Sequence, residues 1–213
     1  MQFADRAEAG RRLARRLLHL KDKRPVVLAL PRGGVPVGFE VASALGAPLD
    51  LVLVRKIGAP YQEELAIGAI ANGEHPELVT SDELVAGIGV SKTYLEQTKA
   101  AALREIERRR HAYLGDRPPV DVTGCTAIVV DDGIATGATM QAALRATRRR
   151  KPAHLVLAVP AAPPDVIARL RAEVDEAVCL ETSKNFFAVG QFYRSFKQLS
   201  DDEVIALLEK ART

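Results

Sequence analysis

The chain has 213 residues, of which 47% are hydrophobic and 27% charged, and its formal net charge is +3. These values exclude collagen-like, low-complexity and highly charged disordered chains, and they indicate one globular domain over residues 1–213. No apolar run approaches membrane-spanning length and no signal-peptide core opens the chain, so we expect a cytoplasmic protein without a membrane anchor. The two cysteines form no C-x-x-C motif, which argues against a structural zinc site or a disulfide framework.

The elements predicted in chain order alternate between strands and helices after an amphipathic first helix, Asp5–Leu20. Apolar runs predict strands at Val26–Leu30, Leu49–Val54, Leu65–Ile70, Ala127–Val130, Leu155–Val159 and Ala177–Leu180. Helical patterns cover Val35–Leu45, Gly137–Arg149 and Asp165–Glu173, and Ser200 caps a last helix that runs through Lys210. Strands that alternate with helices form right-handed crossovers. The fold class expected is therefore α/β, with a Rossmann-like, mostly parallel sheet flanked by helices.

The segment from about residue 72 to 123 interrupts this alternation. Within it, Ser91–Leu114 is rich in strong helix formers and predicts one long helix, which Pro118 and Pro119 end. We interpret the segment as a helical insertion that covers the site or joins a partner subunit, and we prefer a purely structural role. The strand Leu65–Ile70, just before the insertion, either joins the parallel sheet or pairs antiparallel in a hairpin.

Residues 127–140 hold the most informative motif, in which an apolar strand ends at two carboxylates, Asp131 and Asp132. A loop with two glycines and two threonines follows, and then a helix begins. Glycines let several backbone N–H groups converge on one anion, and the helix N-terminus adds a partial positive charge, so the loop suits a phosphate. The carboxylates would repel a phosphate, but they can accept hydrogen bonds from a sugar diol. This motif therefore predicts a ribose 5-phosphate site.

The motif ends without the Gly-Lys-Ser/Thr of a P-loop and lacks G-x-G-x-x-G spacing. It resembles the phosphoribosyl diphosphate (PRPP) signature of the type I phosphoribosyltransferase family, which implies that family's fold. By this resemblance, Asp131 and Asp132 hold the ribose hydroxyls. The following loop wraps the 5-phosphate through Gly133, Ile134, Ala135, Thr136, Gly137, Ala138 and Thr139. The alternative is an ordinary strand followed by an Asp-capped turn and helix.

A second strand–turn–helix unit lies earlier in the chain, where Val26–Leu30 is followed by Pro31, Arg32, Gly33 and Gly34. Its helix N-terminus and guanidinium suit an anion, although the pattern alone also fits a plain turn. This unit resembles the pyrophosphate loop that type I phosphoribosyltransferases have at the same place in their fold. The resemblance implies that Arg32, Gly33 and Gly34 contact the pyrophosphate leaving group.

A third candidate segment, residues 55–64, combines charge, Gly and Pro between two apolar runs, which predicts a loop. The family has a mobile lid here, and the resemblance implies that Arg55 and Lys56 close over the substrate and exclude water. A solvated connection is the alternative. Family members acting on 6-oxopurines carry an acid where this chain has Ala135, so Glu63 or Glu64 could handle the proton instead.

A C-terminal hood over about residues 182–199 is expected from the same resemblance. Half of the chain's ten aromatic residues fall within eleven residues there: Phe186, Phe187, Phe192, Tyr193 and Phe196. They could stack on a flat acceptor base or anchor this tail to the core. Three basic clusters, around Arg11–Arg16, Arg108–Arg110 and Arg148–Lys151, are interpreted as solvated helix faces and ends.

Together these patterns predict a Mg²⁺-dependent phosphoribosyltransferase. It would transfer the phosphoribosyl group of PRPP to a nitrogen acceptor, expected to be a nucleobase, and release pyrophosphate. The catalytic residues expected are Arg32, Arg55, Lys56, Asp131 and Asp132, with Mg²⁺ held by substrate oxygens and water and by no dedicated protein ligands. A homodimer is possible, and binding of nucleic acid or membrane is not expected. The alternatives are a PRPP-sensing regulator that binds nucleic acid and a catalytically inactive homologue.

Overall fold

The computed structural model describes residues 2–72, 77–80 and 82–212 of the chain. Its strands are β1 (Pro25–Ala29), β2 (Leu49–Leu51), β3 (Val54–Ala59), β4 (Gln62–Ala71), β5 (Glu77–Thr80), β6 (Thr126–Val130), β7 (His154–Ala162) and β8 (Glu176–Thr182). Its α-helices are α1 (Arg6–Leu17), α2 (Gly34–Leu45), α3 (Asp82–Ile88), α4 (Lys92–Leu114), α5 (Ala138–Arg149), α6 (Pro164–Leu170) and α7 (Asp201–Lys210). Short 3-10 turns are η1 (Leu18–Leu20), η2 (Arg171–Glu173) and η3 (Val189–Phe192).

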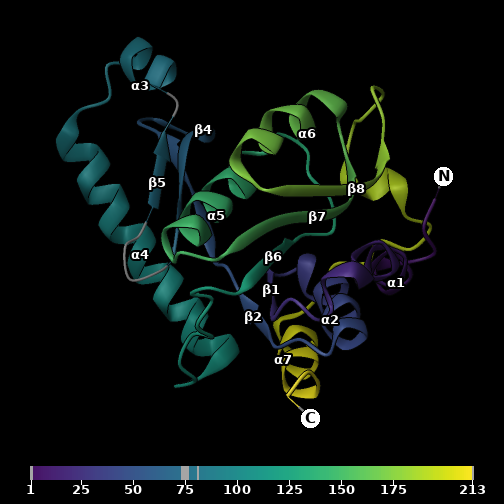
Figure 1. Cartoon of the computed structure of the whole chain (residues 1–213). Coiled ribbons are helices and arrows are strands. Elements are labelled where there is room, and N and C mark those ends of the chain that lie inside the picture. The colour runs from purple at the N-terminus through teal and green to yellow at the C-terminus, as the bar shows by residue number, and fades with distance from the viewer. Residues whose placement is uncertain (1, 73–76, 81, 213) are drawn as a thin grey trace.

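The main sheet is parallel throughout and has the strand order β2-β1-β6-β7-β8 (Figure 1). Its central strands are buried on both faces, so they are apolar beyond their first residues and their side chains alternate between two cores. Val27 and Ala29 of β1 pack with α1, α2 and α7, whereas Val26 and Leu28 pack with α5 and α6. The predicted α/β class with a helix-flanked, mostly parallel sheet is confirmed.

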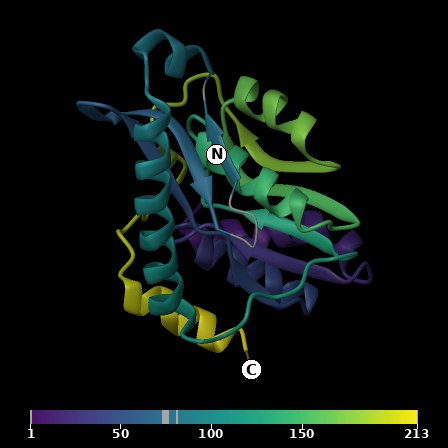
Figure 2. The ribbon, with the colours of Figure 1, turned by 90° about the vertical axis from the view of Figure 1, so that its left-hand side faces the viewer.

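A second sheet, β3-β4-β5, is antiparallel and lies between α4 and α5 (Figures 1 and 2). The antiparallel alternative for Leu65–Ile70 is therefore confirmed, within β4. The predicted strand Leu49–Val54 is wrong in its extent, because β2 ends at Leu51 and Val54 begins the second sheet. The main sheet and the small sheet diverge there, and a continuous apolar run cannot reveal such a break.

The predicted loop over residues 55–64 is also wrong, because β3 and β4 form a hairpin across it. The register between β3 and β4 shifts on both sides of Gly58, so the glycine stays within the hairpin. Pro60 and Tyr61 form the turn, where Tyr61 has a φ of 65°. The segment 72–123 contains the expected long helix, α4, capped by Ser91, which accepts from the Tyr94 N–H. It also contains β5 and α3, which the helical interpretation missed.

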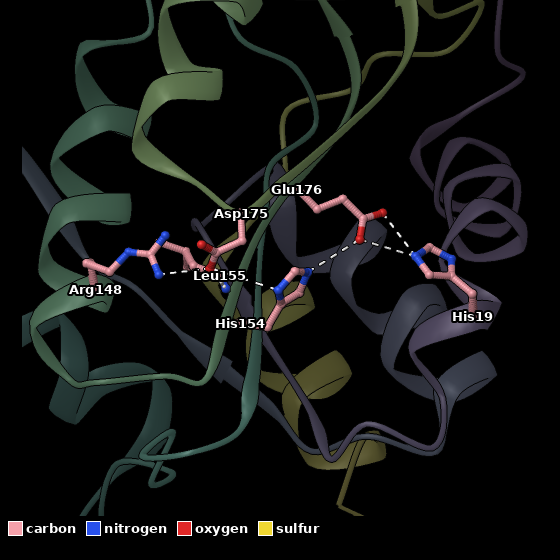
Figure 3. A network of polar contacts seen from close by, with 6 residues as sticks. All are labelled: His19, Arg148, His154, Leu155, Asp175 and Glu176. Carbon is pink, nitrogen blue, oxygen red and sulfur yellow. Dashed lines mark hydrogen bonds and ion pairs between the residues drawn. The ribbon is translucent and has the colours of Figure 1, made fainter.

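A polar network joins elements of both sheet faces at the amino ends of β7 and β8 (Figure 3). His19 of η1 and His154 of β7 both approach the Glu176 carboxylate, at 3.0 and 3.5 Å. Beside it, Asp175 accepts from Arg148 of α5 at 2.8 Å and from the buried backbone N–H of Leu155 at 2.7 Å. Among the residues described here, no helix is both long and apolar enough to span a membrane.

We expect Asp175→Ala to destabilise the protein by about 1–3 kcal/mol, because it leaves the buried N–H of Leu155 without its acceptor. Asp175→Asn keeps an acceptor and loses only the half-exposed ion pair, so it should cost below about 1 kcal/mol. Urea unfolding at pH 7 measures both values. Equal losses for the two variants would contradict the assigned role of the backbone contact.

The Arg148 hydrogen bond lowers the pKa of Asp175, and the Leu155 N–H contributes in the same direction. A carboxylate whose pKa is depressed on folding stabilises the folded state above its unfolded pKa near 4, and this contribution is lost as pH falls through the folded pKa. The difference between wild type and Asp175→Asn should therefore be present at pH 7 and shrink below about pH 4.

Candidate functional site

Two strand–loop–helix units meet at the carboxyl edge of the main sheet. Strands β1 and β6 are paired neighbours, with Ala29 opposite Val130, and the Leu30 N–H donates to the Val130 carbonyl at 2.9 Å. The Arg32-Gly33-Gly34 turn after β1 and the Asp131-Asp132 pair after β6 are thereby placed side by side. Ligands of open α/β sheets bind at such edges. The structure brings together the two motifs that are about 100 residues apart in the chain.

The glycine turn packs directly against the acidic pair. A Cβ atom added at Gly33 would lie 2.0 Å from Oδ2 of Asp132, and one added at Gly34 would lie 2.8 Å from the Val130 carbonyl oxygen. Each distance is shorter than any normal contact. These positions therefore require glycine because of close approach, and not only because a turn is needed.

Asp131 follows the end of β6 and lies beside the negative charge of Asp132. Its Oδ1 accepts from the Asp132 backbone N–H at 2.8 Å. Removal from solvent raises its pKa well above the usual value, and the negative charge of Asp132 raises it further. A carboxylate held in this way is costly to the folded protein, which is typical of groups kept for binding or chemistry.

Asp132 is held by Arg6, which the sequence did not single out, and by Tyr193, one of the aromatic residues of the expected hood. Arg6, the first residue of α1, donates from Nε to Oδ2 at 2.7 Å, and its guanidinium lies 3.9 Å from the centroid of the Phe196 ring. Tyr193 donates its hydroxyl to the Asp132 carbonyl at 2.5 Å, and burial raises the pKa of that phenol. The N-terminal helix and the C-terminal tail thus meet at one residue, Asp132.

The loop after the acidic pair is fixed at both sides. The Ile134 N–H donates to the Ala161 carbonyl of β7 at 2.9 Å, and Arg169 of α6 donates to the Thr136 carbonyl at 2.6 Å. Gly137 takes φ 86° and precedes α5, where it has no side chain to cap the first N–H groups of that helix. Free N–H groups at a helix N-terminus suit an anion, as the predicted phosphate loop requires. Ala135 and Thr136 are exposed at its rim.

The basic residues predicted for the site are only partly brought together. Arg32 is half-exposed, 3.8 Å from the Asp201 carboxylate at the start of α7. Arg55 of β3 faces α4, where it lies 3.7 Å from Glu105. Lys56 is the next residue of the same strand and is exposed on the opposite face of the small sheet, because successive strand residues alternate. The side chains of Glu63 and Glu64 lie outside the described residues.

A pocket of about 320 Å³ opens beside the acidic pair, which is large enough for a small ligand. It is lined by Arg6, Arg32, Gly33, Asp132, Phe196, Lys197, Gln198 and Leu199.

The C-terminal aromatics divide between the two roles left open by the sequence. Phe192 and Tyr193 are buried and anchor the tail, Phe196 forms part of the pocket wall, and Phe187 is exposed.

We expect Asp131→Asn to raise the thermal midpoint at pH 8 by a few degrees. A carboxyl group whose pKa is raised takes up a proton when the chain folds, so folding stability falls as pH rises above the ordinary Asp range near 4. The advantage of the variant should therefore be largest at pH 8 and vanish toward pH 4. Asp116→Asn, at a fully exposed carboxylate, is the control. A less stable Asp131→Asn at pH 8 would refute the assigned burial cost.

Comparison with known proteins agrees with this geometry. A family model described as a phosphoribosyl transferase domain matches residues 2–197. Two curated relatives from Mycobacterium tuberculosis strains, MT0597 and Rv0571c, carry the provisional name of phosphoribosyl transferases. Each is 50% identical over 209 residues, covering 98% of this chain and 47% of the relative, so the chain spans about half their length.

Among solved structures, the protein TT1426 from Thermus thermophilus is similar to this chain over its whole length. The two have a TM-score of 0.84 and 42% sequence identity, and 99% of each chain is covered. The region that matches the family model includes both loops at the carboxyl edge. The chain belongs to the phosphoribosyl transferase domain family and has its type I fold.

Proposed function

We propose that the protein transfers the phosphoribosyl group of PRPP to a nitrogen acceptor and releases pyrophosphate. The observation that carries this proposal is the placement of the Asp131-Asp132 pair between a glycine turn and a phosphate-type loop. Two anion sites on either side of a diol-binding pair match a sugar that bears a phosphate at one end and a diphosphate at the other.

In this proposal, the two carboxylates accept hydrogen bonds from the ribose 2- and 3-hydroxyls. The 5-phosphate binds at the N-terminus of α5 to the Thr136 and Thr139 hydroxyls and to N–H groups of Gly133–Thr139 other than that of Ile134, which already donates to Ala161. Arg6 now neutralises one oxygen of Asp132. A bound diol would share the Asp132 carboxylate with that guanidinium or displace it. Before the diol binds, Arg6 keeps this carboxylate from being buried without a partner.

Pyrophosphate would leave toward Arg32, Gly33 and Gly34, with Arg55 approaching from β3. Breaking the bond at C1 places positive charge on the sugar ring and negative charge on the diphosphate. Fixed guanidinium and N–H groups stabilise the latter without any covalent nucleophile. Lys56 can take part only if the β3–β4 hairpin moves, because the present strand directs it away from Arg55.

The site fits Mg²⁺ that arrives with the substrate. The oxygens of Asp131 and Asp132 are hard ligands, and no cluster of three metal-ligating side chains occurs within the described part of the chain. Mg²⁺ commonly keeps substrate oxygens and water as most of its ligands, with one or two carboxylates. When bound, it would neutralise diphosphate charge.

A nucleobase is the proposed acceptor. The pocket beside Asp132 has the Phe196 ring in its wall, and aromatic side chains favour flat heterocycles. Ala135 offers no carboxylate, which argues against a proton relay of the 6-oxopurine type at that position. A cytoplasmic location, a single domain and a homodimer remain predictions.

Turnover with PRPP, Mg²⁺ and a panel of purine and pyrimidine bases tests the proposal. We expect pyrophosphate release that depends on at least one base. PRPP binding without turnover by any base would instead support the sensor or inactive alternatives. The absence of both binding and turnover would refute the proposed site.

The variant Asp131→Asn/Asp132→Asn should weaken PRPP binding by about 100-fold, because two charged acceptors of the sugar hydroxyls are lost. Isothermal titration calorimetry measures the change, with Asp116→Asn/Asp121→Asn as the charge-matched control on exposed carboxylates. Unchanged PRPP affinity in the double variant would show that the ribose is held elsewhere.

The variant Gly33→Ala should reduce kcat/KM for PRPP by at least about tenfold, because the new methyl group must displace the Asp132 carboxylate or the turn. Gly46→Ala also alters a helix-flanking glycine, but nothing lies within 4 Å of its added Cβ. Gly46 has φ 62°, so that control should lower stability and leave kcat/KM unchanged. Full activity of Gly33→Ala would contradict the close packing.

A further inference from the structure

Helix α4 carries a cluster of charges centred on Glu105. Arg108 donates to its carboxylate from Nε and Nη2 at 2.8 and 2.9 Å, and Arg109 donates from Nε at 2.9 Å. Arg55 of β3 approaches the same carboxylate with Nη1 at 3.7 Å. The hydrogen bonds from Arg108 and Arg109 lower the pKa of Glu105 to about 2. Three guanidinium groups face one carboxylate, so the cluster keeps two positive charges in excess.

The cluster opens toward the carboxyl edge of the main sheet. A hollow there is lined by Leu30 and Pro31 before the glycine turn, Arg55 of β3, Glu105 and Arg109 of α4, and Thr139 of α5. Thr139 belongs to the loop proposed to bind phosphate, and Pro31 precedes the turn proposed to bind pyrophosphate. Arg109 therefore borders the same hollow as Pro31 and Thr139, and the interpretation of its basic cluster as a solvated helix face is incomplete.

Helix α4 also contacts the partner of Arg32. The Tyr113 hydroxyl donates to Oδ1 of Asp201 at 2.6 Å, and Arg32 lies 3.8 Å from the same oxygen. Burial and this hydrogen bond raise the pKa of Tyr113 to about 12, so the phenol remains a donor at neutral pH. One helix thus reaches both Arg55, through Glu105, and Arg32, through Asp201.

We infer that Arg109 joins Arg32 and Arg55 in binding the diphosphate of PRPP, and that Glu105 holds Arg55 and Arg109 until this anion replaces it. The inference rests on the proposed function. A guanidinium fork binds two phosphate oxygens at once, and a diphosphate offers more charge and more oxygens than one carboxylate. Arg55 and Arg109 are half-exposed, so their side chains can turn from Glu105 toward solvent at the mouth of the hollow, whose own volume of about 30 Å³ holds little more than one water molecule.

A purely structural bridge between α4 and β3 makes a different prediction. Removing any member would then change the unfolding free energy. Any effect of replacing Glu105 or Arg109 on ligand affinity would be indirect and equal for all ligands of the site. The two explanations separate when a diphosphate probe and a probe without diphosphate are compared on the same variants.

The test measures binding of pyrophosphate with Mg²⁺, and separately of ribose 5-phosphate, to the 213-residue chain by calorimetry. Arg109→Gln should weaken pyrophosphate binding by about tenfold or more, the usual effect of losing a charged hydrogen-bonding pair. Its affinity for ribose 5-phosphate should stay within about twofold of wild type, since that ligand lacks the diphosphate. Arg104→Gln, an exposed arginine on the same helix, is the control for charge.

The variant Glu105→Gln should have the opposite effect on pyrophosphate affinity. It removes the competing carboxylate and frees the guanidinium groups, so pyrophosphate should bind several-fold more tightly. Glu107→Gln removes the same charge on the same helix, from a 70% exposed side chain paired only distantly with Arg110, and serves as the control. This second variant keeps the inference testable if Arg109→Gln does not fold.

The outcomes distinguish this inference from the proposed function. If wild type binds pyrophosphate and PRPP but Arg109→Gln binds pyrophosphate equally well, α4 takes no part and only the inference is wrong. Equal tightening by Glu105→Gln and Glu107→Gln would reveal a general charge effect and would also overturn it. If wild type binds neither PRPP nor pyrophosphate, the proposed function itself is wrong.

Discussion

The structure depends on the burial of two adjacent carboxylates at the end of β6. Placing Asp131 and Asp132 at the carboxyl edge of a parallel sheet withdraws them partly from water and sets two like charges side by side, which raises the pKa of Asp131. Such a pair persists only when neighbouring groups compensate it. Arg6 supplies the charge, and the glycine turn after β1 leaves the space.

This constraint explains why the N-terminal segment lies against the segment that holds Phe192 and Tyr193. Phe3 and Phe192 are joined by a backbone hydrogen bond of 2.7 Å, and Phe3 packs against Tyr193 with ring centroids 5.5 Å apart. These contacts position Arg6 over the Phe196 ring and direct the Tyr193 hydroxyl to the backbone of Asp132. The aromatic tail therefore has a structural role and also lines the pocket, and neither of the two interpretations of its composition is sufficient alone.

Three guanidinium groups at the carboxyl edge are each paired with a carboxylate from another element. Arg6 is paired with Asp132, Arg32 with Asp201 and Arg55 with Glu105. The Arg32 and Arg55 pairs are partly exposed and contribute little to stability, because water and side-chain entropy offset the attraction, whereas the Arg6–Asp132 pair is mostly buried. Their common position around one edge fits the proposed binding of an anion there. The small antiparallel sheet and α4 extend this ring of charge beyond the parallel sheet.

The sequence by itself determines the local elements of the main sheet and the chemistry of its two loops. Runs such as Ala127–Val130 are apolar at every position because both strand faces are buried. The candidate roles of Asp131, Asp132, Gly33 and Gly34 can be predicted because these residues come directly after such strands. Local patterns are sufficient here because strand, turn and helix are neighbours in the chain.

Only the tertiary structure decides which distant groups meet. Arg6 and Asp132 are 126 residues apart, and no periodicity links them. The division of Leu49–Val54 between two sheets, the strand that carries Arg55 and Lys56, and the approach of Arg109 to the site depend on how α4 and β3 pack. These contacts form because the apolar faces of the elements pack together, and the charged residues lie beside those faces. The sequence around each charged residue therefore does not indicate which partner it will meet.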